Sequence, residues 1–274
     1  TRPDWIFADC TKYLGYATTA RQMPRMAELA IQAAFLERGV GMVILPGDVA
    51  RETIDKPMLP HPIARSRPVS LPVKDDLDAL AKRIDESRKI VIYGGAGCRE
   101  GREEVLALSR KINAPIAWAY RGMDVFEADN PNGIGMIGML GWGAALRALH
   151  ECDLLLMLGT DFPFHGLFPA DTTIVQIDDT ASQLGRRAMV DMALVGDIKT
   201  TVKTLLPMIA EHSDRSFLDD MLALHRDMLR IMAAPLSEPQ NERALSPEQV
   251  ANAIDELADK NAIFTVDTGM CNIW

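Results

Sequence analysis

Short apolar segments alternate with helical segments from Val73 onward, and this alternation constrains the fold more than any other feature of the sequence. Apolar residues recur at helical spacing over 75–86 and 102–112, and a continuous apolar run follows each helix, at 89–93 and at 115–119. Continuous runs without polar alternation are typical of parallel strands that helices cover on both faces. The sequence therefore predicts a doubly wound, Rossmann-like parallel α/β sheet.

The same alternation continues along the chain. Further elements are predicted as a helix near 142–150, strands at 154–158, 173–177 and 193–195, and helices at 198–206 and 214–233. Ahead of the sheet, a helix at 26–36 leads into a strand at 40–45. Near the end, Ser246 and Pro247 have the residue types of an N-cap and a first helical position, and a strand is predicted to begin at Ala262 after that helix.

Proline marks a boundary between domains. Five prolines fall between Asp55 and Pro72, at positions 57, 60, 62, 68 and 72, in a stretch without apolar periodicity. We therefore expect partial α/β domains to flank the sheet, with the segments 1–55, a linker at 56–72, the sheet domain at 73–208, a helix and linker at 209–245, and a further unit at 246–274. Because the chain does not begin with methionine, we expect it to be a piece of a longer polypeptide.

Composition excludes several classes of function. The net charge is −9 and lysine and arginine are not clustered, which argues against a nucleic-acid partner. No apolar run reaches the roughly 18 residues that cross a bilayer, so a soluble protein is predicted. The four cysteines are far apart and lack metal-binding spacing, which is typical of reduced thiols in a cytoplasmic protein.

The stretch VIYGGAG, from Val91 to Gly97, ends a predicted strand in clustered glycines. Gly95 and Gly97 match two positions of the G-x-G-x-x-G fingerprint, but the third position is Glu100, and the next strand ends without a carboxylate. Two interpretations stay open, a backbone cradle for a nucleotide phosphate or a tight strand-to-helix turn.

Candidate ligand residues follow the other strands too. Arg121 is either a diphosphate ligand or a surface charge. The run GIGMIGMLGWG, from Gly133 to Gly143, suits either packing against a flat ring or an ordinary loop. Asp178 has the position of a carboxylate that holds ribose hydroxyls, whereas Asp197 precedes a helix and also suits an N-cap.

The segment LLMLGTDFPFHGLFP places three phenylalanines after a buried strand, in a loop where polar residues are usual. These side chains are either a wall for a planar ligand or a contact with another domain or subunit. His165 lies among them without a catalytic partner, and the sequence holds no nucleophile elbow, P-loop or metalloprotease motif.

Seven motifs, in the order GDV, GGAG, RGM, GMIGMLG, LGTDFP, VQIDDT and ALVGDIK, resemble the thiamine diphosphate-dependent enzymes of the acetohydroxyacid synthase and pyruvate oxidase group. The resemblance implies that 1–55 is the C-terminal part of a pyrimidine-binding domain, 73–208 a central domain that binds extended FAD, and 246–274 the start of a diphosphate-binding domain. The FAD contacts that it implies are Gly95, Ala96, Gly97, Arg121, Ile137, Gly138, Met139, Leu140, Thr160, Asp161, Phe162, Pro163, Phe164, Asp178 and Asp197.

The resemblance is greatest to members that decarboxylate pyruvate to acetate and pass electrons through FAD to a quinone. It implies that thiamine diphosphate and Mg²⁺ bind in regions outside this chain, so no catalytic residue, metal ligand or turnover is expected from this segment alone. It also implies a homotetramer or homodimer in the cytoplasm, with a peripheral contact at the inner membrane face through a C-terminus beyond Trp274. The alternatives are an acetolactate synthase-like protein with structural FAD, a decarboxylase without flavin, and a non-catalytic nucleotide-binding or assembly module.

Overall fold

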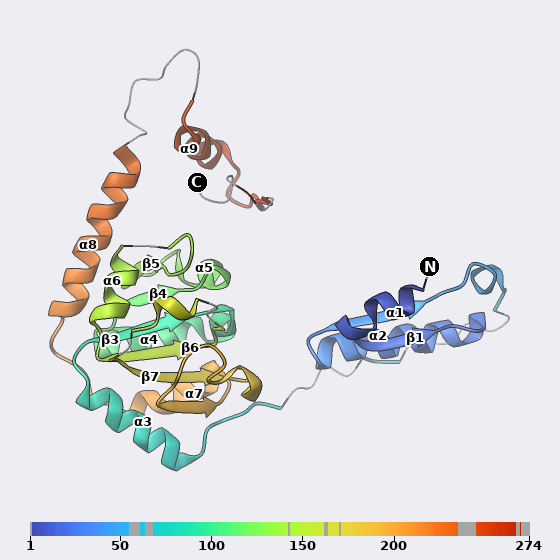
Figure 1. Cartoon of the computed structure of the whole chain (residues 1–274), viewed down its shortest axis with the longest axis horizontal. Helices are drawn as coiled ribbons and strands as arrows, with labels where there is room; N and C mark the ends of the chain where they lie inside the picture. The colour runs from blue at the N-terminus through green and yellow to red at the C-terminus, as the bar shows by residue number, and fades with distance from the viewer. Residues whose placement is uncertain are drawn as a thin grey trace. The chain divides into compact units, whose positions relative to one another are not determined.

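The computed structural model describes residues 2–54, 61–63, 68–141, 143–161, 164–169, 171–234, 245–266 and 269 (Figure 1). The chain forms two compact units, Thr1–Pro68 and Val69–Trp274. The division between them falls inside the predicted proline-rich linker.

The first unit is a single β-α-β element. Strand β1 (Thr11–Tyr16) and strand β2 (Val40–Ile44) are parallel, and helix α2 (Met23–Leu36) connects them after a short helix α1 (Pro3–Phe7). The apolar pattern predicted α2 and β2 but not β1, whose sequence TKYLGY mixes polar residues and glycine with its apolar residues. Pairing with β2, rather than a strong local preference, explains why this segment is a strand.

The second unit contains a parallel sheet of six strands in the order β5-β4-β3-β6-β7-β8. This arrangement confirms the predicted parallel α/β fold. The strands are β3 (Ile90–Gly94), β4 (Ile116–Trp118), β5 (Gly133–Met136), β6 (Leu154–Leu158), β7 (Thr173–Asp178) and β8 (Met192–Val195).

Helices cover both faces of this sheet. The helices of the unit are α3 (Lys74–Glu86), α4 (Arg102–Ile112), α5 (Met123–Phe126), α6 (Ala144–Glu151), α7 (Ile198–Leu205), α8 (Ser216–Ala233) and α9 (Pro247–Leu257). One core lies between the sheet and helices α3, α4, α5 and α7, and the other lies between the sheet and helices α6 and α8.

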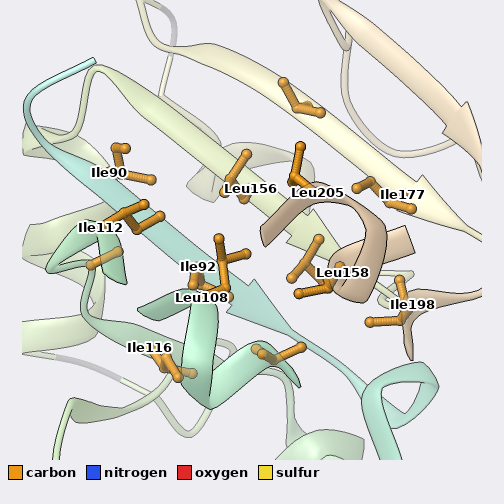
Figure 2. Packing of buried hydrophobic residues seen from close by; sticks show 14 of the residues in the cluster. Ile90, Ile92, Leu108, Ile112, Ile116, Leu156, Leu158, Ile177, Ile198 and Leu205 are labelled. Atoms are coloured by element: carbon orange, nitrogen blue, oxygen red, sulfur yellow. The ribbon is translucent and has the colours of Figure 1, made fainter. Parts of the chain in front are cut away.

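Figure 2 shows the first core, in which Ile92 of β3 and Leu156 and Leu158 of β6 pack against Leu108 of α4 and Leu205 of α7. All five side chains are at most 1% exposed. Because both faces of β3 and β6 are buried in this way, their sequences show no alternation of apolar and charged residues, and the hydroxyl of Tyr93 is the one polar side-chain group in the two strands.

Two sequence-based expectations need correction. The stretch GIGM, expected within an irregular loop, is strand β5, because pairing with β4 supplies the hydrogen bonds that its glycines do not favour by themselves. The prediction of a strand from Ala262 is wrong for the described residues 262–266, which have no regular secondary structure. A strand requires a hydrogen-bonded neighbour, and none pairs with these residues in the described part of the chain.

Candidate functional site

The ends of the six parallel strands bring the predicted ligand residues to one edge of the sheet. Gly95 follows β3, Arg121 follows β4, Ile137 follows β5, Thr160 follows β6, and Asp178 ends β7. Neighbouring strands are about 4.8 Å apart, so the six strand ends span roughly 24 Å. A ligand that reaches all of these loops has to be extended.

The glycines after β3 pack directly against the loop after β6. The Gly95 amide donates to Leu158 O and the Gly97 amide donates to Gly159 O, each at 3.0 Å. A Cβ atom on Gly95 would lie 2.4 Å from Gly159 O, and one on Gly97 would lie 2.7 Å from Gly159 Cα. The close approach of the two loops therefore explains these glycines, while contact of Gly95, Ala96 and Gly97 with a ligand stays a prediction.

The loop after β6 is held from the opposite side by buried polar groups. Thr160 is buried, its side chain shares a hydrogen bond with the Tyr93 hydroxyl, and its carbonyl accepts from Gln176 Nε2 at 3.4 Å. Burial raises the pKa of the Tyr93 hydroxyl, which keeps the hydroxyl protonated as a donor. Contacts within the chain thus fix the position of Thr160.

Asp161 forms ion pairs with two arginines of the segment that follows β7. Arg187 Nε lies 3.0 Å from Asp161 Oδ1, and Arg186 Nη1 lies 3.4 Å from Asp161 Oδ2. These pairs connect the loop after β6 to the loop after β7. The sequence singled out Asp161 as a cofactor contact but neither arginine.

The aromatic loop is partly an intramolecular packing element. Phe164, Leu167 and Phe168 are partly buried and pack against the core under helices α6 and α8, whereas His165 is exposed. Two predicted contacts, Phe162 and Pro163, lie outside the described residues. The sequence left two roles open for these aromatic side chains, a wall for a planar ligand and a contact with another domain or subunit. Packing against the core of the same domain is a third role.

The loops after β4 and β5 form a more apolar end of the edge. Ile137 is buried and its amide donates to Trp118 O at 2.9 Å, while Met139, two residues later, is 83% exposed. Gly138, with a φ of +150°, and Gly141 form a bridge that folds this loop back around Met139 and Leu140. Arg121 is exposed, and no carboxylate pairs with it among the residues that the structure describes.

The strand ends of β7 and β8 carry acidic side chains with local hydrogen bonds. Asp178 Oδ1 accepts from the Thr180 amide at 2.9 Å, and the Asp178 carbonyl accepts from the Gly196 amide. Asp197 Oδ1 accepts from the Thr200 amide at 2.8 Å, which confirms the N-cap interpretation for helix α7. Ligand contacts of both carboxylates stay predictions.

Ionisable groups near the edge offer little acid-base chemistry. Burial raises the pKa of the Cys98 thiol, which donates to Leu158 O, to about 12, so the thiol stays protonated at neutral pH. No group of three or more metal-binding side chains occurs within the described part of the chain. The hollow lined by Asp78, Asp85 and Met208 lies beside α3, and none of the predicted ligand residues lines it.

Residues 77–205 match the thiamine pyrophosphate enzyme central domain. This segment, with its six-stranded parallel sheet, is therefore a central domain of the thiamine pyrophosphate enzyme family.

Three curated relatives illustrate the similarity. An uncharacterized 42.6 kDa protein from Pseudomonas amyloderamosa is 40% identical over 82% of this chain and 57% of its own length. The acetolactate synthase large subunit of Cyanidium caldarium is 29% identical over 86% of this chain and 42% of its own length. Pyruvate oxidase of Lactiplantibacillus plantarum is 24% identical over 98% of this chain and 45% of its own length. The chain spans about half the length of these relatives.

Sequence reasoning missed four residues that build the edge, namely Tyr93, Gln176, Arg186 and Arg187. Gln176 had a visible signal, because it is the one polar residue among the four buried positions IVQI of β7. The two arginines had no such signal, since their pairing with Asp161 joins positions 25 and 26 residues apart.

Among the described residues, no helix has the length and apolar composition to cross a membrane.

Proposed function

We propose that residues 73–208 hold FAD in extended form along the carboxyl edge of the sheet. The arrangement of the strand ends supports this proposal, because polar groups at β6 and β7 lie beside an apolar end at β4 and β5. Thr160 and Asp178 suit the hydroxyl groups of a ribose and ribityl chain. Exposed Met139 and half-exposed Tyr120 suit a flat apolar ring, which would cover side chains that water solvates poorly.

The observation that carries the proposal is the convergence of five loops, after β5, β4, β3, β6 and β7, on one edge of the sheet, over which they span about 19 Å. A compact ligand would use only one or two of these loops. Doubly wound open sheets bind their ligands outside the carboxyl ends of the strands, which supports this position for the flavin. Arg121, which is exposed, adds a positive charge for a diphosphate.

As part of a longer enzyme, this domain would serve the oxidative decarboxylation of pyruvate to acetate and CO₂. Thiamine diphosphate with Mg²⁺ would supply the decarboxylation and FAD the two-electron transfer to a quinone. The residues of this chain would bind and orient the flavin. We propose further that the enzyme is a homotetramer or homodimer of the cytoplasm with a peripheral membrane contact.

A second candidate is an acetolactate synthase-like activity in which FAD has a structural role. The similarity to the acetolactate synthase large subunit of Cyanidium caldarium, at 29% identity, favours it. The two candidates share the flavin site and differ in whether the flavin accepts electrons.

Absorbance spectroscopy of the purified full-length protein tests the proposal. We expect a flavin absorption band that pyruvate, thiamine diphosphate and Mg²⁺ bleach under anaerobic conditions. A colourless protein that takes up no added FAD would refute the flavin site. A flavin band that pyruvate does not bleach would favour the acetolactate synthase-like activity.

Variants at the end of β7 test the ribose contact. Asp178→Ala should weaken flavin retention, whereas Asp179→Ala, one residue further along, should leave it unchanged. Because Asp178 Oδ1 also accepts from the Thr180 amide, Asp178→Asn separates the two roles, since the amide oxygen keeps that hydrogen bond and the charge is lost. Equal retention in all three variants would mean that the ribose contact lies elsewhere.

A further inference from the structure

Gln176 is a buried amide in the middle of a core strand. It lies in β7, is 3% exposed, and follows Ile174 and Val175, which are buried apolar residues. A buried amide costs free energy unless hydrogen bonds replace those to water. The hydrogen-bond partners of the Gln176 side chain therefore show which segments of the chain it connects.

All of the side-chain partners of Gln176 belong to two loops of the candidate site. Nε2 donates to Thr160 O at 3.4 Å in the loop after β6 and to Gln183 O at 3.2 Å in the loop after β7. Oε1 accepts from the Gly185 amide at 2.9 Å. One side chain thus joins the two loops through their backbones.

Tyr93 holds the same loop from the other side of β6. The sheet register places Tyr93 beside Met157 and Met157 beside Gln176, so the two polar side chains flank one residue of β6 on the same face. The Tyr93 hydroxyl shares a hydrogen bond with the Thr160 side chain and donates to Ile137 O at 3.5 Å. Tyr93 therefore connects the loop after β6 to the loop after β5.

The next residue of the β6 loop is fixed as well. Asp161 pairs with Arg186 and Arg187, just beyond the Gly185 amide that Gln176 holds. The side chains of Asp161 and Arg187 are 30% and 29% exposed, so water screens this pair only in part. Thr160, through Gln176, and Asp161, directly, are thus linked to one short segment of the loop after β7.

We infer that Gln176 and Tyr93 are positioning residues of the ligand site, which hold the loops after β5, β6 and β7 in their binding arrangement before the ligand arrives. Neither residue touches the ligand in this scheme, and both act through Thr160 and Asp161. Loops that are already ordered lose less conformational entropy on binding, which raises affinity. The inference rests on the proposed function, because FAD is the ligand that it uses.

The first test is FAD titration of the full chain, followed by quenching of flavin fluorescence. Gln176→Leu keeps the size of the side chain and removes its hydrogen bonds, and we expect the dissociation constant to rise at least about tenfold, which corresponds to about 1.4 kcal/mol. Val175→Ala is the matched control, because Val175 lies in the same strand, is fully buried, and faces the opposite core. This control should change the dissociation constant less than about twofold while lowering stability.

The second test needs no ligand. Amide hydrogen exchange of the chain should show faster exchange in the β6 loop at 160–161 and at the Gly185 amide together in Gln176→Leu, with neither changed in Val175→Ala. Tyr93→Phe keeps the ring and removes the hydroxyl, so it should loosen 160–161 while Gly185 stays protected. It also provides a second variant if Gln176→Leu does not fold.

The outcomes separate this inference from the proposed function. If the unaltered chain binds no FAD, the proposed function fails and hydrogen exchange alone decides the inference. Loss of protection at Gly185 without any change at 160–161 would overturn it, because the two loops would then be independent. A dissociation constant for Gln176→Leu equal to that of Val175→Ala would also overturn it.

Discussion

Gly95→Ala gives the most direct test of why glycines follow β3. The φ and ψ of Gly95 are −121° and −168°, which any residue can adopt, so an added methyl group is opposed by space alone. That group would lie 2.4 Å from Gly159 O and 2.8 Å from Thr160 Cα, atoms of a backbone that cannot rotate away. The two loops would have to separate by about an ångström, since ordinary contacts begin near 3.4 Å.

The cost follows from two effects. Overpacking of a close contact costs about 1–3 kcal/mol, and separation weakens the hydrogen bond from the Gly95 amide to Leu158 O, which adds about 0.5–1.5 kcal/mol. We therefore expect Gly95→Ala to lower the free energy of unfolding by about 2–4 kcal/mol, measured by urea denaturation.

Gly166→Ala is the matched control, because an added methyl group at Gly166 meets no atom of the described residues within 4 Å. Its free energy of unfolding should stay the same or rise by up to about 1 kcal/mol, since alanine restricts the unfolded chain. Equal stability of the two variants would refute the close approach. If Gly95→Ala then also lost FAD affinity, the glycines would serve a ligand instead of packing.

Two further predictions concern side chains away from the candidate site. Met228→Ala should lower the free energy of unfolding by about 2–5 kcal/mol, because the buried Met228 Sδ accepts from the Ala144 amide at 3.1 Å, whereas Met232→Ala on the exposed side of the same helix should change it by less than about 0.5 kcal/mol. Thermal denaturation measures both, and equal effects would contradict the assigned contact. Burial raises the pKa values of Cys98 and Cys152 from 9.0 to about 12, so between these pH values the folded chain binds more protons than the unfolded chain. Stability should therefore fall as pH rises from 9 toward 12, by up to about 1.4 kcal/mol per pH unit for each thiol. Urea denaturation at several pH values measures this slope, which Cys98→Ala with Cys152→Ala should reduce; an unchanged slope would assign the pH dependence to other groups.

Local sequence patterns were sufficient to predict the helices and strands at the core of the sheet domain. The run LLLML is strand β6 at the predicted bounds, and α4 begins and ends at the predicted Arg102 and Ile112, because these segments have both the right periodicity and clear boundaries. The Ser246 cap was equally readable, and it forms a capping box with Gln249. Agreement between local preference and tertiary packing made these elements predictable.

Elements whose conformation depends on distant partners were not predictable. Strands β1 and β5 contain glycine and form through pairing with β2 and β4. In the candidate site, motif spacing identified the strand ends, yet the contacts that shape them join Tyr93 to Thr160 and Asp161 to Arg187 across different strands. A single sequence carries the residue types but not these pairings.

The fixed geometry of Thr160 also has a consequence for how such a domain can change over evolutionary time. Gly159, with a φ of +55°, lies against Gly97 on one side, while Tyr93 and Gln176 bind Thr160 on the other. An inserted or deleted residue there would shift several contacts at once. An added methyl group at Gly166 would meet no atom of the described residues within 4 Å, so insertions and deletions are expected near Gly166 rather than at Gly159.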